Sequence, residues 1–296
     1  MNPNKKLSTQ ENFLQTASQG HLERLKGLYR DSSPDVNWQD DDGFTALAIA
    51  AQYGQAAIVE YLLQRKADPN LATNTGATPL YLASFEKREK VVRVLLRNGV
   101  VDVNKATEEG LTPLHGACVS GAKGIVEQLL NNPKVDVMKT DNNGATPLFA
   151  ACEVGRANIV TRLLKHPQIE PSRPTKFDAT ALWIAAQNGD LTIVKLLLLS
   201  GKELNTTMKC TFDGCNATAA NRARWAQYQP KWKGVPNDDP ARRRNHCASI
   251  AKLIDDFEED PIAVRERLRQ PGAALSPSSL CHIVFNSSRS LSRFLN

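Results

Sequence analysis

The sequence predicts an all-α solenoid, in which pairs of helices stack one after another in a row. A short motif of the form Gly-x-Thr starts at residues 43, 76, 110 and 144, and Asp178 starts a fifth copy. The copies are therefore 33, 34, 34 and 34 residues apart. In every copy an aliphatic block begins 13 residues after the threonine. A fixed period of this length is the signature of a repeat architecture.

The first helix of each unit is expected to begin directly after the motif threonine. Proline suits the first turn of a helix because an N–H group there has no partner, and the threonine side chain can cap the same end. Glycine suits the left-handed conformation that closes a helix. The prolines in question are Pro79, Pro113 and Pro147, and the glycines are Gly54, Gly121, Gly155 and Gly189.

The aliphatic block gives the second helix an apolar face, as in Ile58-Val59-Glu60-Tyr61-Leu62-Leu63. One unit cannot bury such a face alone, so neighbouring units must stack. The copy that begins at Gly76 departs from the pattern, because Lys87 occupies the glycine position. A left-handed turn costs a non-glycine residue about 1 kcal/mol. We therefore expect that turn to differ locally.

The recurring combination of Thr-Pro-Leu, a small pair such as Ala117-Cys118, the closing glycine and Ile-Val-x-x-Leu-Leu resembles the ankyrin repeat, over roughly residues 10 to 260. The resemblance implies helix–turn–helix repeats with short β-hairpin finger loops, whose first helices and fingers form a concave groove. It also implies a monomeric, non-catalytic scaffold or adaptor that binds a partner protein in this groove.

The repeat phase divides the chain into predicted domains. Residues 8–42 are expected to form an N-terminal capping repeat, because Arg24 and Tyr29 replace aliphatic residues there. Residues 212–270 form a degenerate last repeat, followed by a weakly ordered, serine-rich tail over residues 271–296. The five regular repeats are expected over residues 43–75, 76–109, 110–143, 144–177 and 178–211.

An insertion is predicted inside the last repeat. The interval from Thr218 to Ile250 is 32 residues instead of 13, which leaves an insertion of 19 residues between the two helices. Prolines and a glycine predict a surface loop there. The segment from Asp256 to Arg269 begins acidic and ends basic, which favours a helix. The loop-forming residues are Pro230, Gly234, Pro236 and Pro240.

Charge and composition exclude several classes of protein. The net charge is +6, and residues 201–296 carry 15 Lys/Arg against 10 Asp/Glu, which leaves the repeat body near neutral. A general nucleic-acid or membrane role for the body therefore gains no support. No signal peptide and no apolar run of about 18 residues is found, so we expect a cytoplasmic protein. Six cysteines at these spacings predict reduced thiols, with Cys118 and Cys152 buried.

Candidate partner-binding residues occupy fixed phases of the first helix. The third position after the threonine holds Ala48, Tyr81, His115, Phe149 and Trp183. These side chains are either binding anchors or packing residues between successive first helices, and His115, the usual family residue, favours packing. The residues at the seventh and eighth positions after the threonine vary between copies. Selective recognition of a partner would produce this variation, and so would neutral substitution on a solvated face. The predicted contacts are Tyr53, Tyr81, Phe85, Phe149, Glu153, Trp183 and Gln187.

Two other binding functions were weighed for the C-terminal third. Residues 222–244 interleave cations with aromatics, as single-stranded nucleic-acid binders do, although a solvated loop explains this equally well. A nucleic-acid-associated protein is thus the alternative function, and Arg242–Arg244 suggest nuclear import. A zinc site is disfavoured, because His246 and Cys247 are adjacent and cannot easily converge with Cys210 and Cys215 on one tetrahedral centre.

No catalytic site is predicted. The sequence contains no nucleophile elbow, phosphate loop, paired carboxylates or His/Cys couple in a suitable context, so we expect no cofactor, metal or small-molecule substrate. The ankyrin resemblance also implies that asparagines in the loops between repeats can be β-hydroxylated by a 2-oxoglutarate-dependent oxygenase. Asn70 and Asn104 match this position, and Asn37 matches it less well. Alternatively, these asparagines only brace the turn.

Overall fold

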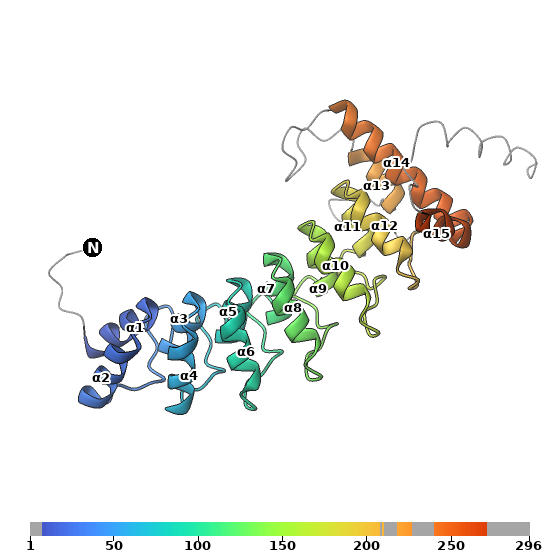
Figure 1. The fold of residues 1–296 in the computed structure, drawn as a ribbon. Helices are drawn as coiled ribbons and strands as arrows, with labels where there is room; N and C mark the ends of the chain where they lie inside the picture. The colour runs from blue at the N-terminus through green and yellow to red at the C-terminus, as the bar shows by residue number, and fades with distance from the viewer. Residues whose placement is uncertain (1–7, 208, 210–217, 227–239, 271–296) are drawn as a thin grey trace, which may run out of the picture.

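The structure, a computed structural model, describes residues 8–207, 209, 218–226 and 240–270. Helix pairs stack into an elongated row (Figure 1), and no described residue lies in a β-strand, which confirms the all-α solenoid. The first helices of the pairs are α1 (Thr9–Gln19), α3 (Ala46–Tyr53), α5 (Pro79–Phe85), α7 (Pro113–Ser120), α9 (Pro147–Glu153), α11 (Ala181–Gln187) and α13 (Ala219–Ala226).

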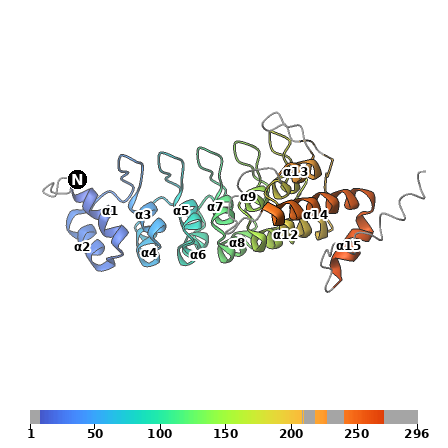
Figure 2. The same ribbon diagram turned by 90° about the horizontal axis from the view of Figure 1, so that it is seen from above.

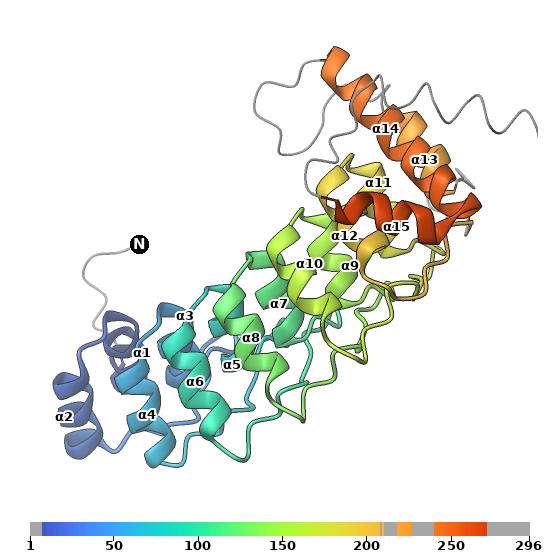
Figure 3. The ribbon, with the colours of Figure 1, turned by 45° about the vertical axis from the view of Figure 1, so that its right-hand side comes forward.

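The second helices form a parallel row beside the first. Figure 2 shows the connecting loops projecting from one side of the stack, with α4, α6 and α8 along the other side. These helices are α2 (Leu22–Ser32), α4 (Ala56–Gln64), α6 (Glu89–Arg97), α8 (Lys123–Leu130), α10 (Ala157–Leu164), α12 (Leu191–Leu199) and α14 (Pro240–Glu259). A last helix, α15 (Pro261–Arg269), packs beside α12 and α14 (Figure 3).

The motif threonines cap the first helices, as predicted. Each hydroxyl accepts a hydrogen bond from the N–H group three residues ahead; the Thr78 Oγ1 to Tyr81 N distance, for example, is 3.2 Å. The five threonines are themselves buried, so the bond replaces one that water would otherwise make. Such a cap contributes about 1 kcal/mol to each helix.

The turn at Lys87 corrects a prediction made from the sequence. Lys87 has φ 59°, so it keeps the left-handed turn that Gly54 forms with φ 81°. The same closing bond is present, because Arg88 N donates to Ala83 O over 2.8 Å as Gln55 N does to Ala50 O. At Gly54 a Cβ would lie 2.9 Å from the Arg88 side chain. The residue in Arg88's place in the next repeat is Ala122, which leaves room for lysine.

A continuous core runs through the stack. It consists of the aliphatic faces of the second helices and one leucine from each of the first helices α3, α5, α7, α9 and α11, such as Leu80 and Leu114. Cys118 and Cys152 are free and fully buried within it, and burial raises the pKa of both thiols. The thiols are therefore packing groups that stay protonated.

The finger loops are tight hairpin turns rather than strands. Two backbone bonds close each turn; in the second finger Thr73 N donates to Ala77 O over 3.0 Å and Gly76 N donates to Thr73 O over 2.8 Å. Neighbouring fingers are joined as well, since Glu108 N donates to Thr75 O over 2.9 Å. Gly76 has φ 78°, and a Cβ there would lie 2.7 Å from Glu108 N. Glycine is therefore required both by the turn and by the close approach of the next finger.

The C-terminal end corrects two further predictions. Pro240 begins helix α14, so residues 240–249 are helical rather than part of a surface loop, while residues 227–239 lie outside the described part. Residues 256–269 do not form one helix, because α14 ends at Glu259 and Pro261 starts α15. Asp260 caps α15 by accepting bonds from Ile262 N and Ala263 N. The predicted tail, 271–296, also lies outside the described residues.

Candidate partner-binding surface

The buried aromatic residues of the third position pack inside the stack. Trp183 is 3% exposed and Phe149 is 8% exposed. His115 is fully buried; its Nδ1 is 3.2 Å from Thr112 N and its Nε2 is 3.1 Å from Ala145 O. Burial favours the packing interpretation for these three residues, because a side chain without exposed surface cannot contact a partner.

Tyr81 and Phe85 form an aromatic pair at the surface. Their rings are stacked, with centroids 6.2 Å apart and planes 12° apart, and Phe85 is 43% exposed. Both lie against Gly116 of α7, where a Cβ would be 3.3 Å from Tyr81 Cε2 and 3.5 Å from Phe85 Cβ. The absent side chain at Gly116 thus leaves room for the edge of the Tyr81 ring and for Phe85 Cβ beside the next repeat.

A carboxylate from the next finger lies near this pair. Burial raises the pKa of Tyr81, and the negative charge of Glu109 raises it further. Glu108 and Glu109 are both exposed at the finger tip. Within the described part of the chain, neither forms an ion pair with a lysine or arginine. The aromatic pair and an unneutralised acidic tip therefore share one surface.

The remaining predicted contacts differ in exposure. Tyr53 is 56% exposed at the end of α3, and Glu153 is exposed at the end of α9. Gln187 is half-buried at the end of α11, and its Oε1 is buried without a hydrogen-bond partner. The side chains that reach solvent thus come from the C-terminal turns of the first helices, together with the finger tips. We call this area the first-helix surface.

Charge is segregated between the two sides of the stack. The first-helix surface is mainly acidic, with Lys87, Arg156 and Lys176 as its exposed cations; its acids are Asp41, Asp42, Glu86, Glu108, Glu109, Glu153 and Asp178. The second helices and their C-terminal turns carry Glu23, Asp31, Glu60, Glu89 and Glu127 against a larger basic set. That set is Arg24, Lys26, Arg30, Arg65, Lys66, Lys90, Arg93, Arg97, Lys123, Arg162, Lys165 and Lys195.

The loop asparagines brace neighbouring repeats. Asn70 Nδ2 donates to Val100 O over 2.8 Å, and its Oδ1 accepts from Asp102 N over 2.7 Å. Asn104 makes the same two bonds one repeat further along, with Lys134 O and Asp136 N. Both asparagines are half-buried. These hydrogen bonds are the ones expected if the asparagines brace the loops, and the hydroxylation of Asn70 and Asn104 stays a prediction.

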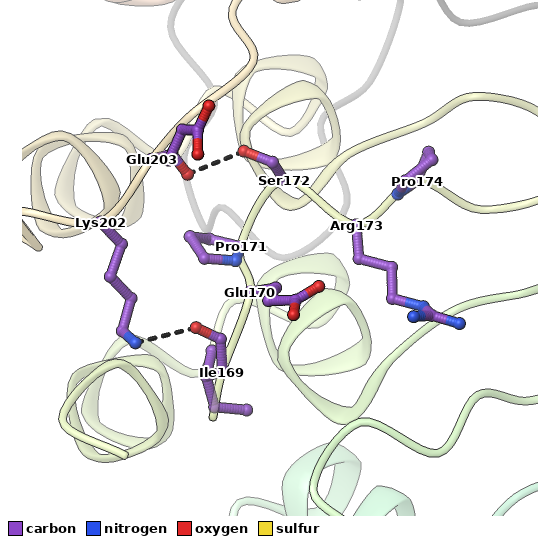
Figure 4. Close-up of a pocket in the computed structure, with 8 residues that line it drawn as sticks. All are labelled: Ile169, Glu170, Pro171, Ser172, Arg173, Pro174, Lys202 and Glu203. Carbon is purple, nitrogen blue, oxygen red and sulfur yellow. Dashed lines mark hydrogen bonds between the residues drawn. The ribbon is translucent and has the colours of Figure 1, made fainter. Parts of the chain in front are cut away.

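A pocket that the sequence did not suggest lies between the loops that follow α10 and α12 (Figure 4). Its volume is about 630 Å³. Ser172 Oγ donates to Glu203 O over 2.8 Å, and Lys202 Nζ donates to Ile169 O over the same distance. These bonds tie adjacent loops together, so the two side chains have a structural use. The pocket is lined by Ile169, Glu170, Pro171, Ser172, Arg173, Pro174, Lys202 and Glu203.

Most residues of the other candidate sites lie outside the part of the chain that the structure describes. Of the four residues weighed for zinc, the structure describes only the Cys247 side chain, which is buried. Among the described residues no group of His, Cys, Asp or Glu could hold a metal ion. The side chains of the cations and aromatics between residues 222 and 244 also lie outside the described part. No helix that the structure describes has the length and hydropathy needed to cross a membrane.

Comparisons with known proteins agree on the repeat. Eighty-three residues are 40% identical to Serine/threonine-protein kinase 12 of Arabidopsis thaliana, covering 28% of this chain and 18% of the kinase. Eighty-seven residues are 36% identical to Transient receptor potential cation channel subfamily A member 1 of Homo sapiens, covering 29% of this chain and 8% of the channel. Each match thus spans less than a fifth of the relative.

The similarity of fold extends further than these segments. The ankyrin repeat domain of Bcl-3, described as a unique member of the IkappaB protein family, matches with a TM-score of 0.62 at 25% identity. The match covers 71% of this chain and 92% of that domain. The family description "Ankyrin repeats (3 copies)" matches residues 13–107, 66–141 and 114–208. Since these matches contain all five motif copies, the chain belongs to the ankyrin-repeat family.

Proposed function

We propose that this chain is a non-catalytic scaffold or adaptor that holds a partner protein on the first-helix surface, the concave side expected of ankyrin repeats. The observation that carries the proposal is the exposure of large aromatic residues, Tyr53 at 56% and Phe85 at 43%, on that surface. Aromatic side chains dominate the energetics of protein interfaces. Ankyrin repeats are protein–protein interaction modules, which supports the same conclusion.

The frame behind this surface is well suited to recognition. Finger tips are linked by backbone hydrogen bonds, such as Asn74 N to Asp42 O at 2.9 Å. First helices are linked at their ends, since Arg88 Nε donates to Gln52 O over 2.9 Å. A braced surface loses little conformational entropy when a partner binds, so more of the contact energy appears as affinity.

The variable positions supply specificity in this proposal. The seventh position varies in size and charge between repeats on an unchanged helical frame: it holds Gln52, Phe85, Val119, Glu153 and Gln187. We assign no catalysis to the chain, because the ankyrin fold is generally non-catalytic. The kinase relative is matched over 83 residues alone, and so it lends no support to an enzymatic role.

Site-specific photocrosslinking tests the proposal. The photoreactive residue p-benzoylphenylalanine would replace Tyr53, Phe85 or, as a control, Val100, which is 68% exposed in the loop after the second helix α6. We expect the positions on α3 and α5 to capture one and the same protein in cells, identified by mass spectrometry, and the control to capture none of it. Equal capture at all three positions, or no capture, would contradict the proposal.

A further inference from the structure

We propose that Tyr81, Phe85 and Glu109 form a binding site for an arginine side chain presented by a basic, extended segment of the partner protein. This inference rests on the proposed function, because it names the chemistry of the segment that the first-helix surface holds. It is specific to α5, α7 and the finger between them, where the structure brings together an exposed aromatic pair and a carboxylate.

The aromatic pair supplies a flat platform. The two rings are nearly parallel, at 12°, and the residue Phe85 is 43% exposed. Gly116 beneath them has no side chain, so the pair rests directly on the backbone of α7. A guanidinium group prefers this kind of surface, because it stacks on an aromatic face and is attracted by its electron density.

The carboxylate supplies the matching charge. Glu109 is exposed, and its negative charge adds to burial in raising the pKa of the Tyr81 phenol. Its position is fixed by the backbone, since Glu109 O accepts from Asn142 N over 2.9 Å and Glu108 N donates to Thr75 O. No lysine or arginine of the described chain pairs with either glutamate, so an external cation would meet no internal competitor there.

The wider surface favours the same kind of partner. Asp41 and Asp42 extend the negative charge along the stack, whereas most cations of the repeat body lie on the second helices and their C-terminal turns. Arg88, the nearest arginine in sequence, is engaged with Gln52 O. Long-range attraction therefore brings a basic segment to this side and an acidic one to the other. Arginine is favoured over lysine because its planar group can stack and pair with a carboxylate at once.

The site is tested by NMR titration of the full-length, ¹⁵N-labelled chain with a hepta-arginine peptide at physiological salt, and with hepta-glutamate as the opposite-charge probe. We expect hepta-arginine to shift the amide signals of residues 81–86, 108–110 and 116, and hepta-glutamate to leave them unchanged. Phe85→Ala and Glu109→Gln should each weaken hepta-arginine binding about fivefold, the size of an exposed cation–π contact or ion pair.

Matched controls separate a site from general attraction. Phe177→Ala removes a similarly exposed aromatic residue from a finger tip outside the proposed site, and Glu60→Gln removes an exposed charge from α4; both should leave the affinity within about twofold. Unchanged affinity in the Phe85 and Glu109 variants, or equal losses in all four, would overturn the inference. Circular dichroism of each variant confirms that it is folded, which is expected because all four side chains are exposed.

Failure of the arginine site can be distinguished from failure of the proposed scaffold function. If photocrosslinking captures a partner but its contacting segment is acidic or lacks arginine, the binding surface stands and the arginine site falls. If no partner is captured while hepta-arginine still binds in the predicted, Phe85-dependent way, the site stands and the scaffold proposal falls.

Discussion

Replacing Trp183 by alanine separates packing from partner contact at the third position. Trp183 is 3% exposed, so the substitution removes a buried aromatic ring. A tryptophan buries about 200 Å², which at about 25 cal/mol per Å² corresponds to about 5 kcal/mol. This is an upper limit, because alanine keeps part of the contact and the unfolded chain already buries part of the area. We therefore expect the free energy of unfolding to fall by about 3 to 4 kcal/mol.

The loss of stability in Trp183→Ala should lower the melting temperature and should weaken the helices around α11 more than the rest of the stack. For a domain of this size, about 3 kcal/mol lowers Tm by about 10 °C. Because α11 packs on α9, α12 and α13, amide exchange should accelerate in those helices first, while α3 and α4 keep their protection. Trp183→Phe retains most of the apolar area and should cost less than about 1.5 kcal/mol.

The assay combines chemical unfolding, hydrogen exchange and crosslinking on one purified sample. Capture of the partner through Phe85 should persist in Trp183→Ala under conditions where the variant is folded. A loss of stability below about 1 kcal/mol would refute the packing assignment. Lost capture with unchanged stability would instead make Trp183 a binding anchor, and the burial argument would be wrong.

Three further predictions follow from individual residues. Lys87→Gly should raise the free energy of unfolding by about 1 kcal/mol, because it removes the cost of a lysine in the left-handed conformation. Lys87→Ala should leave the free energy of unfolding nearly unchanged, and equal effects of the two substitutions in urea unfolding would contradict this. Burial lowers the pKa of His115 in the folded chain, so the unfolded chain binds more protons below about pH 6.5. Stability should thus be full above that pH and fall as the pH drops, and His115→Gln should remove part of this dependence in unfolding curves measured from pH 5 to 8. Mass spectrometry of protein from its own cell should find one added oxygen atom on Asn70 and Asn104, and unmodified peptides would exclude their hydroxylation there.

The helical frame could be predicted because each copy solves the same local problems with the same residue types. The threonine caps and closing glycines act within one turn of the chain, so their spacing alone is informative. The turn at Lys87 was mispredicted because a local cost of about 1 kcal/mol was weighed alone. In the stack this cost is outweighed by the burial of both helices that the turn joins, and so lysine adopts the glycine conformation.

The prolines of the last repeat illustrate the same limit. Pro240 and Pro261 both occur where the sequence suggested a loop or a continuous helix, and both begin helices. Proline lacks an N–H group, which excludes it from a helix interior but suits the first turn. Whether a proline ends one element or starts another depends on the chain that follows, and α14 and α15 have apolar faces that pack on the stack.

Exposure at the candidate surface depends on the neighbouring repeat, which is why the sequence could not rank its residues. Tyr81 and Trp183 share one repeat position, yet Tyr81 reaches the surface and Trp183 does not. Tyr81 faces Gly116, whose missing side chain lets the ring lie against the helix. The phase therefore predicts the side of the stack on which a residue lies, while the adjacent helix decides how much of it is covered.

The near-neutral charge of the repeat body conceals two faces of opposite sign. A helical repeat returns each position to the same side of the stack, so acids that recur near the fingers and cations that recur on the second helices cannot mix. At physiological salt the screening length is about 8 Å, and a helix with its side chains is about 10 Å across. A partner on one face therefore experiences mainly the charge of that face. The net charge of the body, which gives no support to a general nucleic-acid or membrane role, does not govern binding at the first-helix surface.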